Sequence, residues 1–183
     1  MAEKNKSNFW GNLGDVYASL GGISAIFSSS YFILSIVLSL MGWRSIFVDN
    51  DINSWTTTII AIFPSLAGFS IAAFALLFAL LDQRTKELLG KPSERFGGNS
   101  PLMIVVSILT HALIVQVVAI LYALSFQMKP FPDFLGISLW ANKAFAYLGI
   151  WITFYGVLLM IAVVLTIFKM VELLNKPHPP HTD

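Results

Sequence analysis

The sequence predicts an all-α polytopic membrane protein with four transmembrane helices and an N-terminal interfacial segment. The second and fourth helices are expected to extend into the cytoplasm. Two observations predict this class. The 183 residues are 56% hydrophobic and only 11% charged, far more apolar than an average globular chain. Long apolar runs also recur along the chain, and about 20 apolar residues are enough to span a bilayer core.

The N-terminal segment, residues 1–22, is expected to be cytoplasmic and to contain an amphipathic stretch. Leu13, Val16, Tyr17 and Leu20 share one helical face, with Asn12 and Asp15 opposite. This arrangement suits a short helix lying in the membrane interface. The pair Gly21-Gly22 then marks the bend into the first span.

Residues 23–175 form the predicted transmembrane domain, and residues 176–183 a disordered cytoplasmic tail. The helical pattern of the second span continues to Leu89, and that of the fourth to Asn175. A helix from Thr57 to Leu89 is roughly 50 Å long at 1.5 Å per residue, longer than the bilayer core. Both helices are therefore expected to project into the cytoplasm. The four spans are about 23–43, 57–81, 102–126 and 144–168.

Small residues follow one stripe of the second span, at spacings of three and four. In lipid, such a stripe is where another helix backbone can approach closely. We expect this helix to be the packing spine of the protein, with a second small-residue stripe on the fourth span. The helix-packing residues are Ala61, Ser65, Gly68, Ala72, Ala75 and Ala79, then Gly149, Thr153 and Gly156.

Polar side chains inside the spans have two possible roles. Ser24, Ser28, Ser35 and Ser39 share one stripe of the first span, and His111 and Gln116 lie in the third. Intramembrane ionisable groups are candidates for function because their desolvation is costly. Hydroxyls and a neutral histidine also hydrogen-bond neighbouring helices. Packing is the expected role, and the lining of a pore is the alternative.

The distribution of basic residues predicts the orientation. Eight basic residues fall in the N-terminal segment, the second loop and the C-terminal end, against three on the other side. The basic side is cytoplasmic by the positive-inside rule, so both termini are expected there. The two helical extensions and the second loop then form a charged platform for docking a partner. Its residues are Arg84, Lys86, Lys91, Arg95, Lys169 and Glu172.

The sequence shows none of the motifs by which catalytic or cofactor-binding sites are usually recognised. Cysteine is absent, and the sequence has neither a zinc-ligand spacing nor a glycine-rich phosphate loop. Asp49, Asp51 and Asn53 begin like a calcium loop, but Ser54 stands where that loop needs glycine. We therefore expect no enzyme, no cofactor, no metal and no direct binding of nucleic acid, whereas contact with anionic lipid headgroups is expected.

The layout also bears a resemblance. Four spans, cytoplasmic termini and the segment Pro-Ser-Leu-Ala-Gly-Phe-Ser-Ile-Ala-Ala-Phe-Ala-Leu-Leu at residues 64–77 resemble the small membrane effectors of bacterial antiphage systems. Among these, the chain is most similar to the membrane subunits of the Kiwa system. The resemblance implies a homo-oligomer of the bacterial inner membrane, with a tetramer favoured. It also implies a soluble cytoplasmic partner that binds DNA. It assigns no site residue.

Three functions follow as hypotheses. The first is a non-enzymatic membrane scaffold or sensor that oligomerises and recruits a cytoplasmic partner. The second is an oligomeric ion-permeable pore, suggested by the serine stripe and His111. The third and weakest is a transporter subunit, because neither broken helices nor midplane charges are evident.

Overall fold

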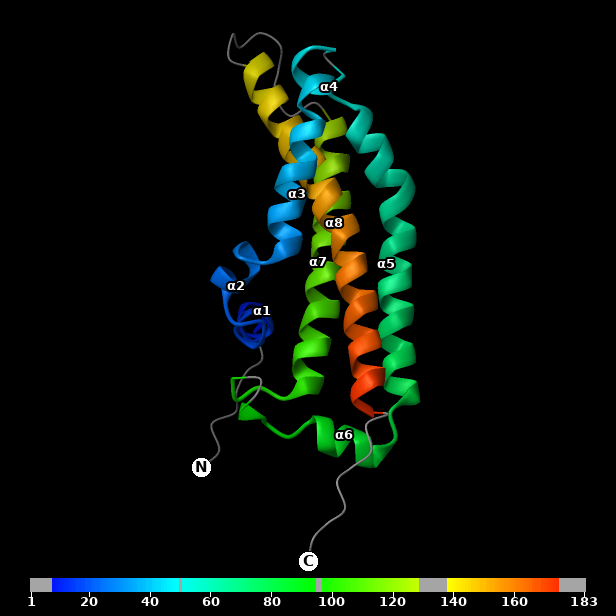
Figure 1. Ribbon diagram of the computed structural model, residues 1–183. Coiled ribbons are helices and arrows are strands. Elements are labelled where there is room, and N and C mark those ends of the chain that lie inside the picture. The colour runs from blue at the N-terminus through cyan, green and yellow to red at the C-terminus, as the bar shows by residue number, and fades with distance from the viewer. Residues whose placement is uncertain (1–7, 50, 95–96, 129–137, 175–183) are drawn as a thin grey trace, which may run out of the picture.

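The computed structural model describes residues 8–49, 51–94, 97–128 and 138–174, and every regular element in these ranges is a helix. Three long helices run side by side and form the body of the molecule (Figure 1). They are α5 (Ser54–Leu80), α7 (Pro101–Gln127) and α8 (Ser138–Leu174). By length and composition, all three can cross a membrane. The prediction of an all-α membrane protein is confirmed at this level.

The long helices match the predicted second, third and fourth spans closely. Each begins a few residues before its predicted span or at its edge, because the polar residues there still favour a helix. Ser100 caps α7 by accepting a hydrogen bond from the Met103 N–H (3.1 Å), and Pro101 occupies the first turn. At Asp51, a carboxylate oxygen accepts from the Ser54 N–H (3.2 Å) where α5 begins.

The predicted first span, about 23–43, is not a single helix. It divides into α2 (Ile23–Phe27) and α3 (Ser30–Met41). Ser29 has an extended backbone and accepts a hydrogen bond from the Phe32 N–H (3.2 Å), so it caps a new helix and ends the old one. With 12 residues, α3 is only about 18 Å long. It is too short to cross a core of about 30 Å alone.

The N-terminal helix α1 (Phe9–Ser19) lies across the long helices, and Figure 1 shows it almost end-on. Leu13, Val16, Tyr17 and Leu20 are half-buried against the bundle, whereas Asn12 and Asp15 are exposed. The predicted face is therefore the packed one. Gly21 and Gly22 have φ values of +89° and +87°, which glycine adopts without strain, and they turn the chain into α2. A location in the membrane interface stays a prediction.

The second helix does not extend straight into the cytoplasm as expected. It ends at Leu80, because Leu81 takes an extended backbone (ψ 117°). A separate helix, α6 (Gln83–Leu89), then crosses the base of the bundle (Figure 1). The fourth helix, in contrast, continues without interruption to Leu174 and is about 55 Å long.

The core consists of two apolar layers stacked along the bundle. The layer near α6 contains Leu77, Leu109 and Val163, and the layer near α4 (Trp43–Phe47) contains Ile59, Phe63 and Ala123. Large apolar side chains also remain exposed on every long helix, as expected of surfaces that face lipid. The predicted disordered tail 176–183 and the platform residue Arg95 lie outside the described residues.

Candidate functional site

The small-residue stripe of α5 points away from the rest of the chain. Ala61, Ser65, Gly68, Ala72, Ala75 and Ala79 are all exposed. A Cβ atom added at Gly68 meets no atom within 4 Å. The packing within the chain therefore does not use this stripe, although a role between chains stays a prediction. The opposite face of α5 packs inward through Ile59, Phe63, Ser70, Ala73 and Leu77.

The small-residue stripe of α8 does pack inside the molecule. A Cβ atom at Gly149 would lie 2.5 Å from the Trp55 indole, and one at Gly156 would lie 2.6 Å from the Phe63 ring. Two large side chains of α5 thus fill two glycine gaps on α8. Thr153, between them, donates to the Gly149 carbonyl (2.8 Å). The prediction that these residues pack helices is consistent with this geometry.

A third small-residue stripe, on α7, is buried inside the bundle. Ala112, Gln116, Ala119 and Ala123 are fully buried, each at 0% exposure. The alternating spacing of four and three was visible in the sequence. It was a weaker signal than the α5 stripe because it has fewer members.

Gln116 belongs to a polar cluster between the two apolar layers. Its amide oxygen accepts from the Ser70 hydroxyl (3.1 Å), and its amide nitrogen donates to the Met160 sulfur (2.8 Å). Ser70 also donates to the Leu66 carbonyl (3.1 Å). The cluster joins α5, α7 and α8, and interhelical hydrogen bonds of this kind stabilise membrane bundles. This geometry favours the packing role for Gln116.

His111 lies in a different place, against α8 and α1. Its Nε2 is 2.8 Å from the Tyr155 hydroxyl, and the Tyr17 ring meets its edge at 5.7 Å between centroids. The second ring nitrogen, Nδ1, is buried without a hydrogen-bond partner among the described residues. Sequence reasoning identified His111 but missed both tyrosines, which lie on other helices. His111 and Gln116 do not form a common site.

Two of the four serines in the stripe of the first span, Ser35 and Ser39, pack against α8, whereas Ser24 and Ser28 are exposed. Ser35 accepts a hydrogen bond from the Trp151 Nε1 (2.9 Å), and Ser39 lies 3.4 Å from the Tyr147 hydroxyl. Both serines are buried, and each also donates to a carbonyl of its own helix. Ser28 is exposed and donates to the Ala25 carbonyl (3.2 Å). These contacts leave no serine-lined path through the described part of the chain.

The basal surface, as we call Arg84, Lys86, Lys91, Lys169 and Glu172, lies at the α6 end of the bundle. Lys169 pairs with Glu172 at 3.0 Å, with the lysine side chain 72% exposed. Asp82 accepts from the Thr85 N–H (2.7 Å) at the start of α6. Hydrogen bonds from Thr85 lower the pKa of the Asp82 carboxyl, and the nearby positive charges of Arg84 and Lys86 act in the same direction.

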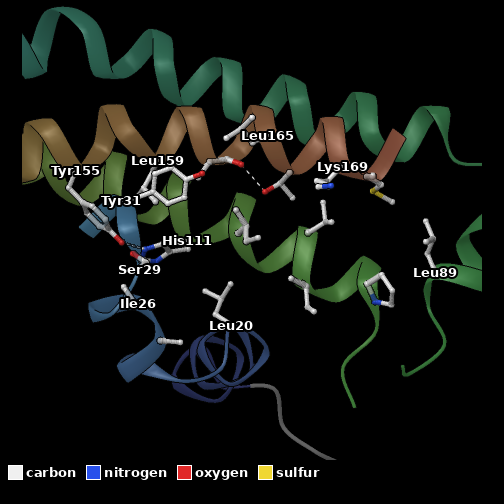
Figure 2. A pocket seen from close by; sticks show the side chains of 18 residues that line it. Leu20, Ile26, Ser29, Tyr31, Leu89, His111, Tyr155, Leu159, Leu165 and Lys169 are labelled. Atoms are coloured by element: carbon white, nitrogen blue, oxygen red, sulfur yellow. Dashed lines mark hydrogen bonds between the residues drawn. The ribbon is translucent and has the colours of Figure 1, made fainter. Parts of the chain in front are cut away.

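A cavity of about 400 Å³ lies between α1, α2, α7 and α8. Figure 2 shows His111 and Tyr155 at one end of it and Lys169 towards the other. Most of its wall is aliphatic. No pattern in the sequence pointed to it, because its lining comes from five separate helices and from Leu20, the C-terminal cap of α1. Ser29, at the break between α2 and α3, is among the residues that line it.

Comparisons with protein families, with curated proteins and with solved structures gave no match. Within the described ranges, the structure also contains no group of three or more histidine, aspartate or glutamate side chains arranged to hold a metal ion. Function is therefore inferred from the exposed stripe, the basal surface and the cavity.

Proposed function

We propose that this chain is a membrane scaffold or sensor subunit that assembles with copies of itself and recruits a soluble cytoplasmic partner. The observation that carries the proposal is that two separate surfaces, the α5 stripe and the basal surface, lie on the outside of the described chain. The exposed stripe of α5 runs along the bundle, whereas the basal surface lies across its end. One surface suits a neighbouring helix in lipid, and the other suits a protein in water.

The basal surface has the features of a fixed platform. Half-buried Leu89 of α6 packs against the core layer that contains Met170 of α8. This contact places α6 and the end of α8 against the same core layer, at one end of the bundle. Arg84 and Lys91 are exposed there beside the exposed carboxylates of Asp82 and Glu87, and a partner with a complementary pattern of charges fits this mixed surface.

The setting of the proposal is the inner membrane of a bacterium, in antiphage defence, with both termini cytoplasmic. The excess of basic residues at the α6 end supports this orientation. The resemblance to Kiwa membrane subunits motivates the tetramer, the DNA-binding partner and the role in defence. In this proposal α3 forms the half of the first crossing next to α4, and α2 and α1 carry the chain on towards the cytoplasmic side.

The pore alternative receives less support from the geometry. Ser35 and Ser39 hydrogen-bond tyrosine or tryptophan side chains of α8, and Gln116 is enclosed by α5 and α8. A pore would therefore have to form between copies of the chain. Ion flux through liposomes that contain the purified protein tests this alternative directly.

Charge reversal tests the recruitment of a partner. Arg84→Glu combined with Lys86→Glu should abolish co-purification of the partner, because it inverts the charge of the basal surface. The matched control is Arg44→Glu with Lys143→Glu, which changes the same charge at the opposite end of the bundle. Quantitative mass spectrometry of the purified complexes measures the difference. An unchanged yield of partner with the basal variant contradicts the proposal.

A further inference from the structure

The cavity occupies the space that a continuous first span would have filled. Below Ser29 the chain turns sideways into α2 and α1, while α7 and α8 continue downwards beside the gap (Figure 1). The faces of α7 and α8 that would have met a helix there line the cavity instead. At about 400 Å³, the cavity is within the size range of pockets that hold small ligands.

The wall is predominantly apolar, which favours hydrocarbon over water. Ile108, Leu159 and Ala162 form part of a predominantly aliphatic lining. Ordered water needs two to four polar partners. His111 Nε2 and the Tyr155 hydroxyl already contact each other at 2.8 Å, which leaves His111 Nδ1 as the buried polar atom of this pair without a partner among the described residues. An empty space of this size would forfeit the close packing typical of protein interiors. The cavity also reaches the outer surface at Leu165, which is 50% exposed.

The length and charge of the cavity specify the occupant further. From Tyr155 to Lys169 the α8 backbone rises about 21 Å, close to half of a bilayer with its headgroup region. Lys169 is the one charged residue of the described lining. It contacts Glu172 through one N–H, and an ammonium group has three donors. A cation at one end and hydrocarbon along the rest match an anionic lipid.

We propose that the cavity binds one acyl chain of an anionic phospholipid, with the lipid phosphate at Lys169 and the chain directed towards Tyr155. The lipid replaces the missing half of the first span and completes the packing of α7 and α8. It also fixes α1 and α2, because Leu20 and Ile26 belong to the same wall. This inference does not depend on oligomerisation or on a cytoplasmic partner.

Native mass spectrometry tests the proposal on the full chain. The purified protein is incubated with detergent micelles that contain either phosphatidylglycerol or phosphatidylcholine. We expect one phosphatidylglycerol to be retained per chain. Ala162→Trp should abolish retention because the indole fills the cavity. Leu165→Trp should also abolish retention, because the indole blocks the opening of the cavity. Lys169→Gln should weaken the binding of phosphatidylglycerol about fivefold and leave the binding of phosphatidylcholine unchanged.

The matched control is Val164→Trp, a neighbour on α8 that is 50% exposed and lies outside the cavity lining. It should retain lipid like the wild type. Equal retention by Leu165→Trp and wild type overturns the proposal, as does equal retention of the two lipids. Because the chain has no cysteine, Leu165→Cys introduces a single thiol at the opening of the cavity. This thiol can form a disulfide with a second copy of the chain if that copy, and not a lipid, occupies the cavity. A disulfide-linked dimer through this residue, without bound lipid, also overturns it.

Discussion

At the scale of single residues, the packing depends on which helix contributes the small side chains. Gly149 and Gly156 receive Trp55 and Phe63, whereas Gly68 faces outward with open space around it. In sequence, these glycines look alike, since each lies on a small-residue stripe. The sequence pattern predicts that a helix has a close-packing face, but the partner's large side chains decide where the contact forms.

A pair of alanine substitutions separates the two kinds of glycine. Gly156→Ala should lower the free energy of unfolding by about 1–3 kcal/mol, because its Cβ would lie 2.6 Å from the Phe63 ring. Gly68→Ala should be neutral or stabilising, since it adds helix propensity without a clash. Denaturation of the detergent-solubilised protein, followed by circular dichroism, measures both. Equal losses in the two variants would refute this assignment of the packing faces.

At the scale of elements, hydrophobic runs predicted helices better than they predicted helix breaks. The runs around α5, α7 and α8 are long and contain few competing polar groups, so their positions agree with the structure. The two breaks occur where a side chain caps a new helix. Ser29 caps α3, and Asp82 precedes α6. Both residues also fit a helix interior, and tertiary packing chooses between the two conformations.

The cap of α6 should depend on pH. The pKa of Asp82 is lowered from 3.8, mainly by hydrogen bonds from Thr85. A depressed pKa means that the ionised carboxylate is the form that stabilises the cap. Its contribution is complete above the ordinary pKa and disappears as the pH falls through the depressed value. A spin label at Glu87→Cys should therefore become more mobile as the pH falls below 3.8.

The matched control for this experiment is Asp82→Asn in the same labelled background. Asparagine still accepts the Thr85 N–H hydrogen bond but does not titrate. The mobility of the label in this variant should not follow the same acid transition. If both proteins show the same transition, the carboxylate of Asp82 is not its origin.

At the scale of the whole molecule, the sequence predicted the class of protein but not the surfaces that matter. Composition and the long apolar runs predicted a helical membrane protein. It did not show that the α5 stripe is exposed, because one chain cannot tell an internal contact from a contact between chains. It also could not show the cavity, which needs the first span to break at Ser29 and leave α7 and α8 uncovered.

The exposed stripe of α5 should be the contact between copies of the chain. Gly68→Leu should dissociate the oligomer because a bulky side chain separates the closest backbones. It should leave the protomer folded, since no atom of the protomer lies within 4 Å of an added Cβ. Val118→Leu, on the exposed face of α7, is the control. Light scattering of the purified proteins reports the mass. A Gly68→Leu variant of wild-type size contradicts this contact.

The most direct test of the scaffold proposal is the mass of the native complex after mild solubilisation, with identification of every protein in it. The proposal predicts a homo-oligomer, with four copies favoured, that carries a soluble protein in fixed stoichiometry. A homo-oligomer without a partner would contradict recruitment and favour the pore. A monomer without a partner would contradict both functions.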